Sequence, residues 1–557
     1  MNRIRKAWWL PAAASAGLAI ALYAVSLGGT YVYDDFEVLF NDARLRDSSQ
    51  WKLYWTQSYN GGVDNLYRPL VSMSYAIQWW LHGDRVWAFH LINILLHAGV
   101  CALVAEFTRR LLITCLSARA IAGAADPGSA STTPSTECRQ DRSTRGALLA
   151  GLLFAALPIH VEAVANIVGR AELMCAAGAM GALVLFLHRP MTTARAFAIT
   201  ACFVLSLLSK EQGMLLPLLL LVLALCLQLR PQIRVVSAIA IESAPELDYQ
   251  PADIARRDET QRRAWLALIL MLCWGLAGYI VLRESILKFW WDRIFLDSTI
   301  QPMVLSRGVD RWMLPVSLIG RYAALLIFPV KLSPDYGGMV IGSAIRFDDP
   351  YFWIGVIAIL AWLGFAVLAI FRRNGVMLFC LLALAITYGV VGNIVTLIGT
   401  NFGERLMYLP SVFFVILIAV ALQELPRISF AAIGTIILIA TSLKTFSYAR
   451  RWNDRLSFYQ TALEEQPKSI RLYMLTASEL MSQKRLDEAA DVVARGRELM
   501  PDYHEIWIQS GVIALEAGKL DDADAYLDHA LQLKPGFKAG AWKDKVAQRR
   551  RELQAPK

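Results

Sequence analysis

Long runs of apolar residues, separated by short polar segments, dominate the chain up to about residue 450. A membrane-spanning helix needs about 20 mostly apolar residues, and eleven runs reach or approach that length. These runs cover residues 8–29, 86–112, 146–157, 171–188, 194–208, 213–229, 264–282, 351–371, 376–398, 408–422 and 428–446. The pattern predicts an all-α polytopic membrane protein with about eleven transmembrane helices.

A twelfth apolar stretch covers residues 311–330 but has Arg321 near its middle, and Pro315 and Pro329 interrupt it. A charged side chain at the centre of a bilayer is costly. We therefore expect this stretch to lie in the membrane surface or to re-enter the membrane, as part of an outer membrane-associated segment over residues 283–350.

Composition agrees with a membrane protein. Of the 557 residues, 56% are hydrophobic and 18% are charged, with a mean hydropathy of +0.43, whereas soluble domains carry about 25% charge. This excludes a disordered protein, a disulfide mini-scaffold and a simple soluble enzyme.

The positive charge orients the predicted helices. Cytoplasmic loops are rich in Lys and Arg, and Arg3, Arg5 and Lys6 precede the first run. Eleven crossings place the basic segments 109–145, 188–195, 230–263 and 372–373 on that same side. The first run is too long for a cleaved signal peptide. We expect a cytoplasmic N-terminus and an outer C-terminus, and the net charge of +9 then gives no reason to expect a nucleic-acid partner.

Two further segments differ from the apolar runs. Residues 118–145 are rich in small and polar residues and predict a disordered cytoplasmic loop. In residues 450–557, Pro467, Pro501 and Pro535 are 34 residues apart, which is the tetratricopeptide period. We expect residues 1–449 to form the membrane domain and residues 450–557 a periplasmic tetratricopeptide solenoid, serving as a peptide-binding groove, a structural cap or a dimer contact.

Polar side chains gather at the predicted outer ends of the helices, beginning with a first outer loop over residues 30–85. Asp34 and Asp35 follow the first run; adjacent carboxylates raise one another's pKa, so either is a candidate general base, although a helix N-cap is an equally ordinary role. The other candidates in these clusters are Arg68, His160, Glu162, Arg170, Glu172, Lys210, Glu211, Glu404, Arg405 and Tyr408. Cations of this kind bind phosphate and acids transfer protons, so the clusters suit a lipid-linked phosphate substrate. Singly, each ion pair could be structural.

Several motifs occur together in one order. The acidic pair is followed by Tyr-Arg-Pro-Leu (67–70), Pro-Ile-His-Val-Glu-Ala-Val (158–164), Val-Gly-Arg-Ala-Glu-Leu (168–173), Ser-Lys-Glu-Gln-Gly (209–213) and Gly-Glu-Arg-Leu-Met-Tyr-Leu-Pro-Ser (403–411). Together with the repeats, they resemble the transmembrane and tetratricopeptide-repeat-containing O-mannosyltransferases of the GT-C superfamily. The resemblance covers nearly the whole chain, but the repeat array is shorter than in the animal proteins and the 118–145 loop is unlike the family core.

The resemblance implies transfer of mannose from a polyprenyl-phosphate carrier to Ser or Thr of a protein, outside the cytoplasm. It implies Asp34 or Asp35 as the catalytic base, assisted by Glu162 or Glu172. It implies Arg405, Lys210 and Arg170 as carrier-phosphate ligands, with Arg68 as a weaker candidate. No cofactor is predicted: the acidic pair could bind a divalent metal, but no complete ligand set is visible. We expect a bacterial inner membrane, although an endoplasmic reticulum also fits.

Two other functions remain open. The spans could anchor a non-enzymatic repeat scaffold for cell-envelope assembly, and deleting residues 457–557 is expected to abolish a scaffold's function but to leave an enzyme active on a simple acceptor. A lipid-linked sugar flippase would need polar residues deep in the spans, and few are present.

Overall fold

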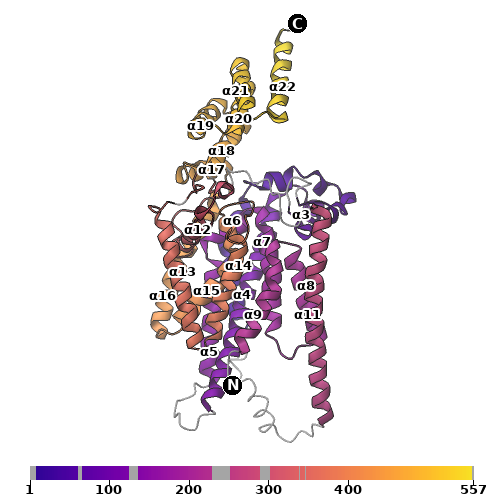
Figure 1. Ribbon diagram of the computed structural model, residues 1–557, viewed down its shortest axis with the longest axis vertical. Coiled ribbons are helices and arrows are strands. Elements are labelled where there is room, and N and C mark those ends of the chain that lie inside the picture. Colours follow the sequence, from indigo (N-terminus) through magenta and orange to yellow (C-terminus); the bar gives the residue numbers. More distant parts are fainter. Residues whose placement is uncertain are drawn as a thin grey trace.

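The computed structural model describes residues 8–59, 66–124, 136–228, 251–288, 301–337, 339–344 and 346–554. Within these residues every regular element is a helix and no strand occurs. The helices form an upright bundle, above one end of which stand the C-terminal helices (Figure 1). The all-α fold class predicted from the sequence is confirmed.

All eleven predicted apolar runs form helices of the bundle. They are α1 (Leu10–Tyr23), α4 (Val86–Ala124), α5 (Thr136–Ala155), α7 (Arg170–Phe186), α8 (Thr193–Leu207), α9 (Leu216–Gln228), α11 (Pro251–Leu287), α13 (Pro350–Phe371), α14 (Gly375–Val391), α15 (Tyr408–Leu422) and α16 (Arg427–Arg451).

The apolar helices differ in how readily they could cross a membrane. Among the described residues, eight helical segments are long and apolar enough, and α5 adds a ninth if it is joined to the short helix α6 (Val161–Ala165) across a 50° bend. Helices α8 and α14 have 15 and 17 residues, or roughly 22 and 25 Å at 1.5 Å per residue. They fall short of a hydrocarbon core of about 30 Å, so flanking residues must complete any crossing.

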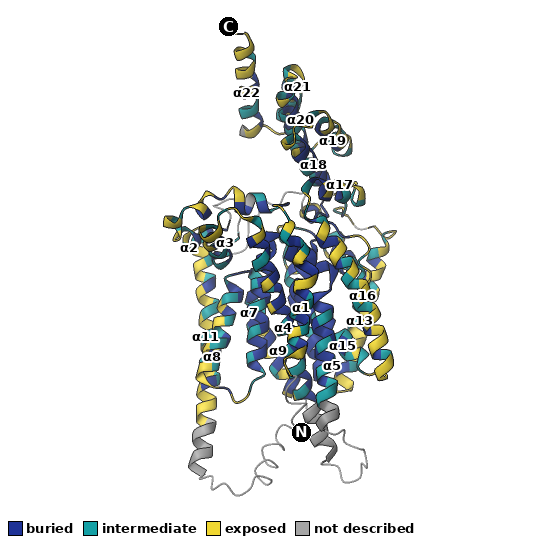
Figure 2. Cartoon of the chain, turned by 180° about the vertical axis from the view of Figure 1, so that it is seen from behind, coloured by how far each residue is buried: buried dark blue, intermediate teal, exposed yellow. Residues whose placement is uncertain are grey.

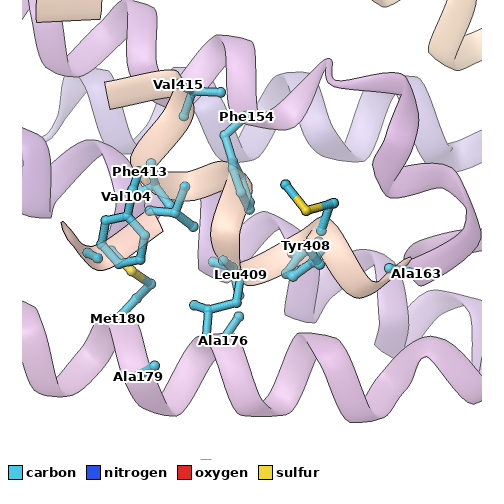
Figure 3. Packing of buried hydrophobic residues seen from close by; sticks show 14 of the residues in the cluster. Val104, Phe154, Ala163, Ala176, Ala179, Met180, Tyr408, Leu409, Phe413 and Val415 are labelled. Carbon is cyan, nitrogen blue, oxygen red and sulfur yellow. The ribbon is translucent and has the colours of Figure 1, made fainter. Parts of the chain in front are cut away.

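The centre of the bundle is a closely packed apolar core between α4, α5, α7 and α15. Figure 3 shows Val104, Phe154, Met180 and Phe413 packed together, and all four are fully buried. The proportion of buried residues falls from 83% in the span that includes α7 to 11% in α13. Figure 2 accordingly shows much exposed surface on α11, α13 and α16. Side chains such as Trp274 and Phe371 are exposed there, as expected where lipid is the solvent.

Short elements cover the end of the bundle that carries the C-terminal helices. They are η3 (Phe36–Phe40), η4 (Ala43–Arg46), η5 (Ser48–Gln50), α2 (Leu53–Thr56), α3 (Pro69–His82), η9 (Pro302–Leu305) and α12 (Val309–Ile327). Three more one-turn elements, η6 (Pro158–His160), η7 (Ile167–Gly169) and η8 (Glu211–Leu215), break the ends of neighbouring long helices. We call this side of the molecule the array end.

The C-terminal segment is an array of helical hairpins. Its helices are α17 (Arg455–Glu465), α18 (Ile470–Ser482), α19 (Leu486–Leu499), α20 (His504–Glu516), α21 (Leu520–Leu533) and α22 (Phe537–Gln554). The hairpin α18–α19 recurs as α20–α21 at the period of the three prolines. Small residues allow the close packing: a Cβ on Gly511 would lie 2.7 Å from Leu527. Assignment of these hairpins to the tetratricopeptide class stays a prediction.

The prediction of a disordered loop over residues 118–145 is wrong at both ends of that range. Helix α4 continues to Ala124 and α5 begins at Thr136, while residues 125–135 lie outside the described residues. The start of α5 is helical because it packs on the α15–α16 connection. Arg142 donates to the Gln423 carbonyl at 3.2 Å, and Asp141 pairs with Arg427 at 2.9 Å.

The twelfth apolar stretch forms α12, which contains Pro315 and does not meet the length and hydropathy criteria for a span. Arg321 lies beside the first turn of α13, where its guanidinium pairs with Asp349 at 3.1 Å and stacks on the Tyr351 ring at 4.3 Å. The cation is therefore balanced at the array end.

Helices α7 and α8 approach so closely that we expect a single added methyl group at their contact to destabilise the fold. A Cβ on Gly178 would lie 2.5 Å from the Cys202 carbonyl oxygen. We predict that Gly178→Ala lowers the free energy of unfolding by about 1–3 kcal/mol, the usual range for overpacking. The measurement is the thermal midpoint of the full chain in detergent.

The matched control is Gly99→Ala in α4, where a new Cβ meets nothing within 4 Å and the higher helix propensity of alanine should leave stability equal or greater. Equal midpoints for the two variants would contradict the close α7–α8 contact.

Candidate functional site

A cavity of about 390 Å³ opens at the array end of the bundle. Its lining comes from the first outer loop, from α6 and α7, from the break between α8 and α9, from α11, from residues 334–335 and 390–406, and from α18. One part of the wall is apolar, with Met214, Leu287, Val390, Val391 and Leu397. The other part is densely charged.

The charged wall holds as many carboxylates as cations. The carboxylates are Asp34, Glu162, Glu172, Glu211 and Asp335, and the cations are Arg68, Lys210, Arg283, Arg405 and Arg471. The five negative and five positive formal charges cancel, so the charged wall is formally neutral.

Asp34 lies between two guanidinium groups. Arg405 donates to its Oδ2 at 2.9 Å and Arg471 donates to its Oδ1 at 2.9 Å. Burial alone would raise the pKa of Asp34, but the two arginines outweigh it and lower the pKa below the ordinary aspartate value. Asp34 is therefore an ionised carboxylate with both oxygens held by cations.

Arg405 connects Asp34 to Glu162. It lies in the single turn η10 (Glu404–Met407) that opens α15. Its backbone N–H donates to Glu162 Oε2 at 2.8 Å, and its Nε lies 3.4 Å from Glu162 Oε1. Its Nη1 is buried and has no hydrogen-bond partner among the described residues. An unsatisfied guanidinium N–H beside a cavity is the kind of donor that an anion accepts.

Two more ion pairs line the same wall. Lys210 Nζ contacts the Glu172 carboxylate, and Arg68 Nη2 lies 2.8 Å from Glu211 Oε2. Burial lowers the pKa of Lys210 below its ordinary value. Lys210 and Glu211 lie together in the turn that follows the end of α8. Gly213 allows this turn to pack against the end of the helix, because a Cβ on Gly213 would lie 2.4 Å from the Ser206 carbonyl carbon.

The backbone before Asp34 is strained. Tyr33 has a φ of +59°, a left-handed conformation that costs a non-glycine residue about 1–2 kcal/mol. Three contacts hold it: its N–H donates to Tyr459 Oη at 2.9 Å, its hydroxyl donates to Asp335 at 3.2 Å, and its ring lies under Arg471. Such conformations persist where surrounding contacts determine them, so the direction of Asp34 is enforced.

Asp35, predicted alongside Asp34, does not line the cavity. It is fully buried, and its two oxygens accept from the backbone N–H groups of Val32 at 3.1 Å and Val168 at 3.0 Å. Burial raises its pKa to about 8. The two carboxylates thus diverge, and Asp35 ties the first outer loop to η7.

Seven of the twelve predicted residues line the cavity: Asp34, Arg68, Glu162, Glu172, Lys210, Glu211 and Arg405. Their roles stay predictions. Beside Asp35, the other four lie outside the cavity lining and are buried. Glu404 accepts from Tyr336, His160 contacts Ser411, and Tyr408 contacts His97. No group of three His, Cys, Asp or Glu side chains in the described ranges is arranged to hold a metal ion.

Arg170, predicted as a phosphate ligand, is fully buried among protein groups. Its Nε donates to Asn93 Oδ1 at 2.9 Å, its Nη2 donates to the Phe89 carbonyl at 3.1 Å, and its guanidinium lies 4.6 Å from the centre of the Tyr75 ring. A guanidinium so enclosed holds α3, α4 and α7 together.

Sequence reasoning missed Arg471, Asp335 and Tyr33 as cavity residues. Arg471 is 437 positions from Asp34 in the chain and carries no local motif. Only the docking of α18 on the first outer loop brings the two together, and no periodicity or spacing signals that contact.

The enclosed position of Arg170 gives a stability prediction. Arg170→Lys retains the charge but loses the planar fork of donors, and each buried acceptor left without a hydrogen bond costs about 1–3 kcal/mol. We expect a lower thermal midpoint for the full chain than with Arg346→Lys, which alters the exposed Arg346–Asp348 pair. An unchanged midpoint for Arg170→Lys would contradict a structural role.

Comparison with known proteins identifies several relatives. The chain is 26% identical over 457 residues to a Drosophila melanogaster protein named Protein O-mannosyl-transferase Tmtc3, covering 76% of this chain and 47% of that protein. It is 24% identical to Protein O-mannosyl-transferase F38B6.6 of Caenorhabditis elegans, covering 82% of this chain and 58% of that protein. It is also 32% identical to human Protein O-mannosyl-transferase TMTC4, covering 28% of this chain and 20% of that protein.

The chain therefore spans about half the length of the first two curated relatives. No family model matches it, and no solved structure matches it. The similarities to the first two relatives, at 26% and 24% identity, extend across most of the chain, and their shared name agrees with the motif order. These similarities support the relation to the TMTC O-mannosyltransferase family that the motif order indicates.

Proposed function

We propose that this protein is an integral-membrane glycosyltransferase. It moves mannose from a polyprenyl-phosphate carrier to a Ser or Thr hydroxyl of a protein acceptor, on the extracytoplasmic face of a bacterial inner membrane. The observation that carries the proposal is one cavity, at one end of an apolar bundle, whose wall is part apolar and part charged. The names of the relatives indicate mannose and protein as the substrates to test.

The cavity wall suits a lipid-linked phosphate. The side chains of Met214, Leu287 and Val390 offer a surface for the first isoprene units, and Arg283 lies one turn before Leu287 on α11. On the charged wall, the Nη1 of Arg405 has no hydrogen-bond acceptor among the described residues. A phosphate that accepts from Arg405 satisfies this N–H with a charge-assisted bond.

Donor binding then changes Asp34. Arg405 contacts Asp34 Oδ2 through its Nη2, and a phosphate that accepts from its Nη1 competes for the same guanidinium. When Arg405 turns to the phosphate, Oδ2 is released and Asp34 becomes more basic, because a cation that favoured its ionised form has moved away. Asp34 is thereby prepared as a base only when the donor is present.

The transfer step follows from this arrangement. The acceptor hydroxyl oxygen attacks the anomeric carbon of the sugar, and its proton passes to Asp34 Oδ2. The bond between the anomeric carbon and the phosphate oxygen breaks, and its electron pair leaves on the polyprenyl phosphate. Direct displacement inverts the anomeric configuration. Glu162 holds the backbone and Nε of Arg405, so it positions the cation that stabilises the leaving phosphate.

The membrane face is proposed from the distribution of basic residues. Arg109 stacks on Trp8, just before α1 begins. Near the start of α5, Arg142 donates to the Gln423 carbonyl and Asp141 pairs with Arg427 at the α15–α16 connection. Figure 1 places the start of α5 at the end opposite the array. By the positive-inside rule that end is cytoplasmic, and the cavity and the array face the periplasm.

A non-enzymatic scaffold explains less. Several charged side chains of the cavity, Glu162, Glu172 and Lys210 among them, are nearly buried, and burying charges costs several kcal/mol per ion even when they are paired. A docking surface has no need of such groups, whereas a site that stabilises a leaving phosphate does.

The proposal is tested with the full chain in lipid nanodiscs, supplied with polyprenyl-phosphate [¹⁴C]mannose and a Ser/Thr-rich acceptor protein. We expect radiolabel to enter the acceptor in an alkali-sensitive O-linkage. Asp34→Asn should lower kcat/KM by about 10²–10⁴-fold, the usual contribution of a general base.

The matched control is Asp348→Asn, which removes an exposed carboxylate outside the cavity lining and should leave transfer unchanged. Absence of transfer by the wild-type chain from polyprenyl-phosphate mannose, or full transfer by Asp34→Asn, would contradict the proposal.

A further inference from the structure

The first hairpin of the C-terminal array docks on the cavity mouth through polar contacts. Tyr459 of α17 accepts the Tyr33 N–H at 2.9 Å. Ser469, the N-cap of α18, donates to Asp335 Oδ2 at 2.6 Å. Both Tyr33 and Asp335 line the cavity, so the array is held against the site itself.

Arg471 enters the cavity from this hairpin. It lies in the first turn of α18, its Nη2 donates to Asp34 Oδ1 at 2.9 Å, and its guanidinium carbon lies 4.3 Å from the centre of the Tyr33 ring. Its side chain is one-third exposed, consistent with a position at the rim. The membrane domain alone therefore supplies only one of the two cations that hold Asp34.

We propose that Arg471 is a positioning residue of the transferase site, which the array contributes to the membrane domain and which holds Asp34 by Oδ1 while Oδ2 takes the acceptor proton. This rests on the proposed function. Arg405 and Arg471 contact different oxygens of Asp34, so a phosphate can draw Arg405 away without releasing the carboxylate. Arg471 then keeps Asp34 ionised and directed into the cavity.

The role proposed for Arg471 changes the result expected from deleting residues 457–557. That deletion removes Tyr459, Ser469 and Arg471 together with the rest of the array. Loss of transfer to a simple acceptor is then expected of an enzyme, so the deletion does not distinguish an enzyme from a scaffold. Point variants in the full chain are needed.

The charge on Asp34 depends on several neighbours. The charged and titratable groups that face it come from the first outer loop, α6, η10 and α18, and they are Tyr33, Asp35, Glu162, Arg405 and Arg471. Of these five groups, Arg405 and Arg471 favour its ionised form. Removing the positive charge at position 471 therefore raises the pKa of Asp34, because an adjacent cation stabilises a carboxylate.

The test compares Arg471→Gln, Arg471→Lys and the control Arg485→Gln in the full chain, by the pH dependence of kcat/KM for mannose transfer. The acid limb of that profile reports the free enzyme's essential base. In Arg471→Gln we expect the acid limb to move about one pH unit higher, at the lower end of the range for one adjacent cation. Arg471→Lys keeps the positive charge, so its acid limb should lie close to the wild-type position.

Arg485→Gln removes an arginine of the array that pairs with exposed Glu488, and it should leave the profile in place. An acid limb that does not move in Arg471→Gln, while Asp34→Asn still lowers kcat/KM as predicted, would overturn the role of Arg471 and leave the proposed function standing.

A second measurement is independent of activity. Thermal midpoints of Asp34→Asn, Arg471→Gln and the double variant form a double-mutant cycle, with Asp34→Asn and Arg485→Gln as the control cycle. We expect the first cycle to be non-additive, because the residues are in contact, and the second to be additive. Additivity in the first cycle would overturn the proposal even if the wild-type chain proved to transfer no sugar.

Discussion

The ion cluster centred on Arg405 is the interaction on which the rest of the site depends. Arg405 contacts Asp34 of the first outer loop and Glu162 of α6, so three segments far apart in the chain meet at one guanidinium. A largely buried cation such as Arg405 needs its carboxylate partners to remain in place, because leaving it unpaired is costly. The break of α5 into α6, the strained Tyr33 and the short turn that opens α15 all serve to hold those groups at one point.

The same cluster explains why the C-terminal array belongs to the site. Asp34 has two oxygens, and the membrane domain occupies one of them with Arg405 while α18 occupies the other with Arg471. The docked array therefore completes the wall of the cavity beside Asp34. In the proposed mechanism, a substrate phosphate replaces Asp34 as the partner of Arg405, which raises the basicity of Asp34 without breaking its contact with the array.

Periodicity and hydropathy predicted the helices well, because lipid imposes a simple rule on spanning segments. The same rule could not separate Asp34 from Asp35: both follow one apolar run, and only the left-handed Tyr33 and the amides of Val32 and Val168 send them in different directions. Arg170 belongs to the same sequence motif as Glu172, which lines the cavity, but the Arg170 side chain is fully buried outside the cavity lining. Arg471 was missed because its partner is remote in sequence, and the start of α5 was mistaken for a loop because its helix is stabilised by tertiary contacts.

The most direct test of the account is a structure of the full chain in nanodiscs with polyprenyl-phosphate mannose bound. The account predicts the phosphate against Arg405, the isoprenoid along Leu287 and Val390, and Asp34 Oδ2 no longer within hydrogen-bond distance of Arg405. Asp34 Oδ1 should still contact Arg471. A phosphate bound elsewhere, with the Arg405–Asp34 pair intact, would contradict it.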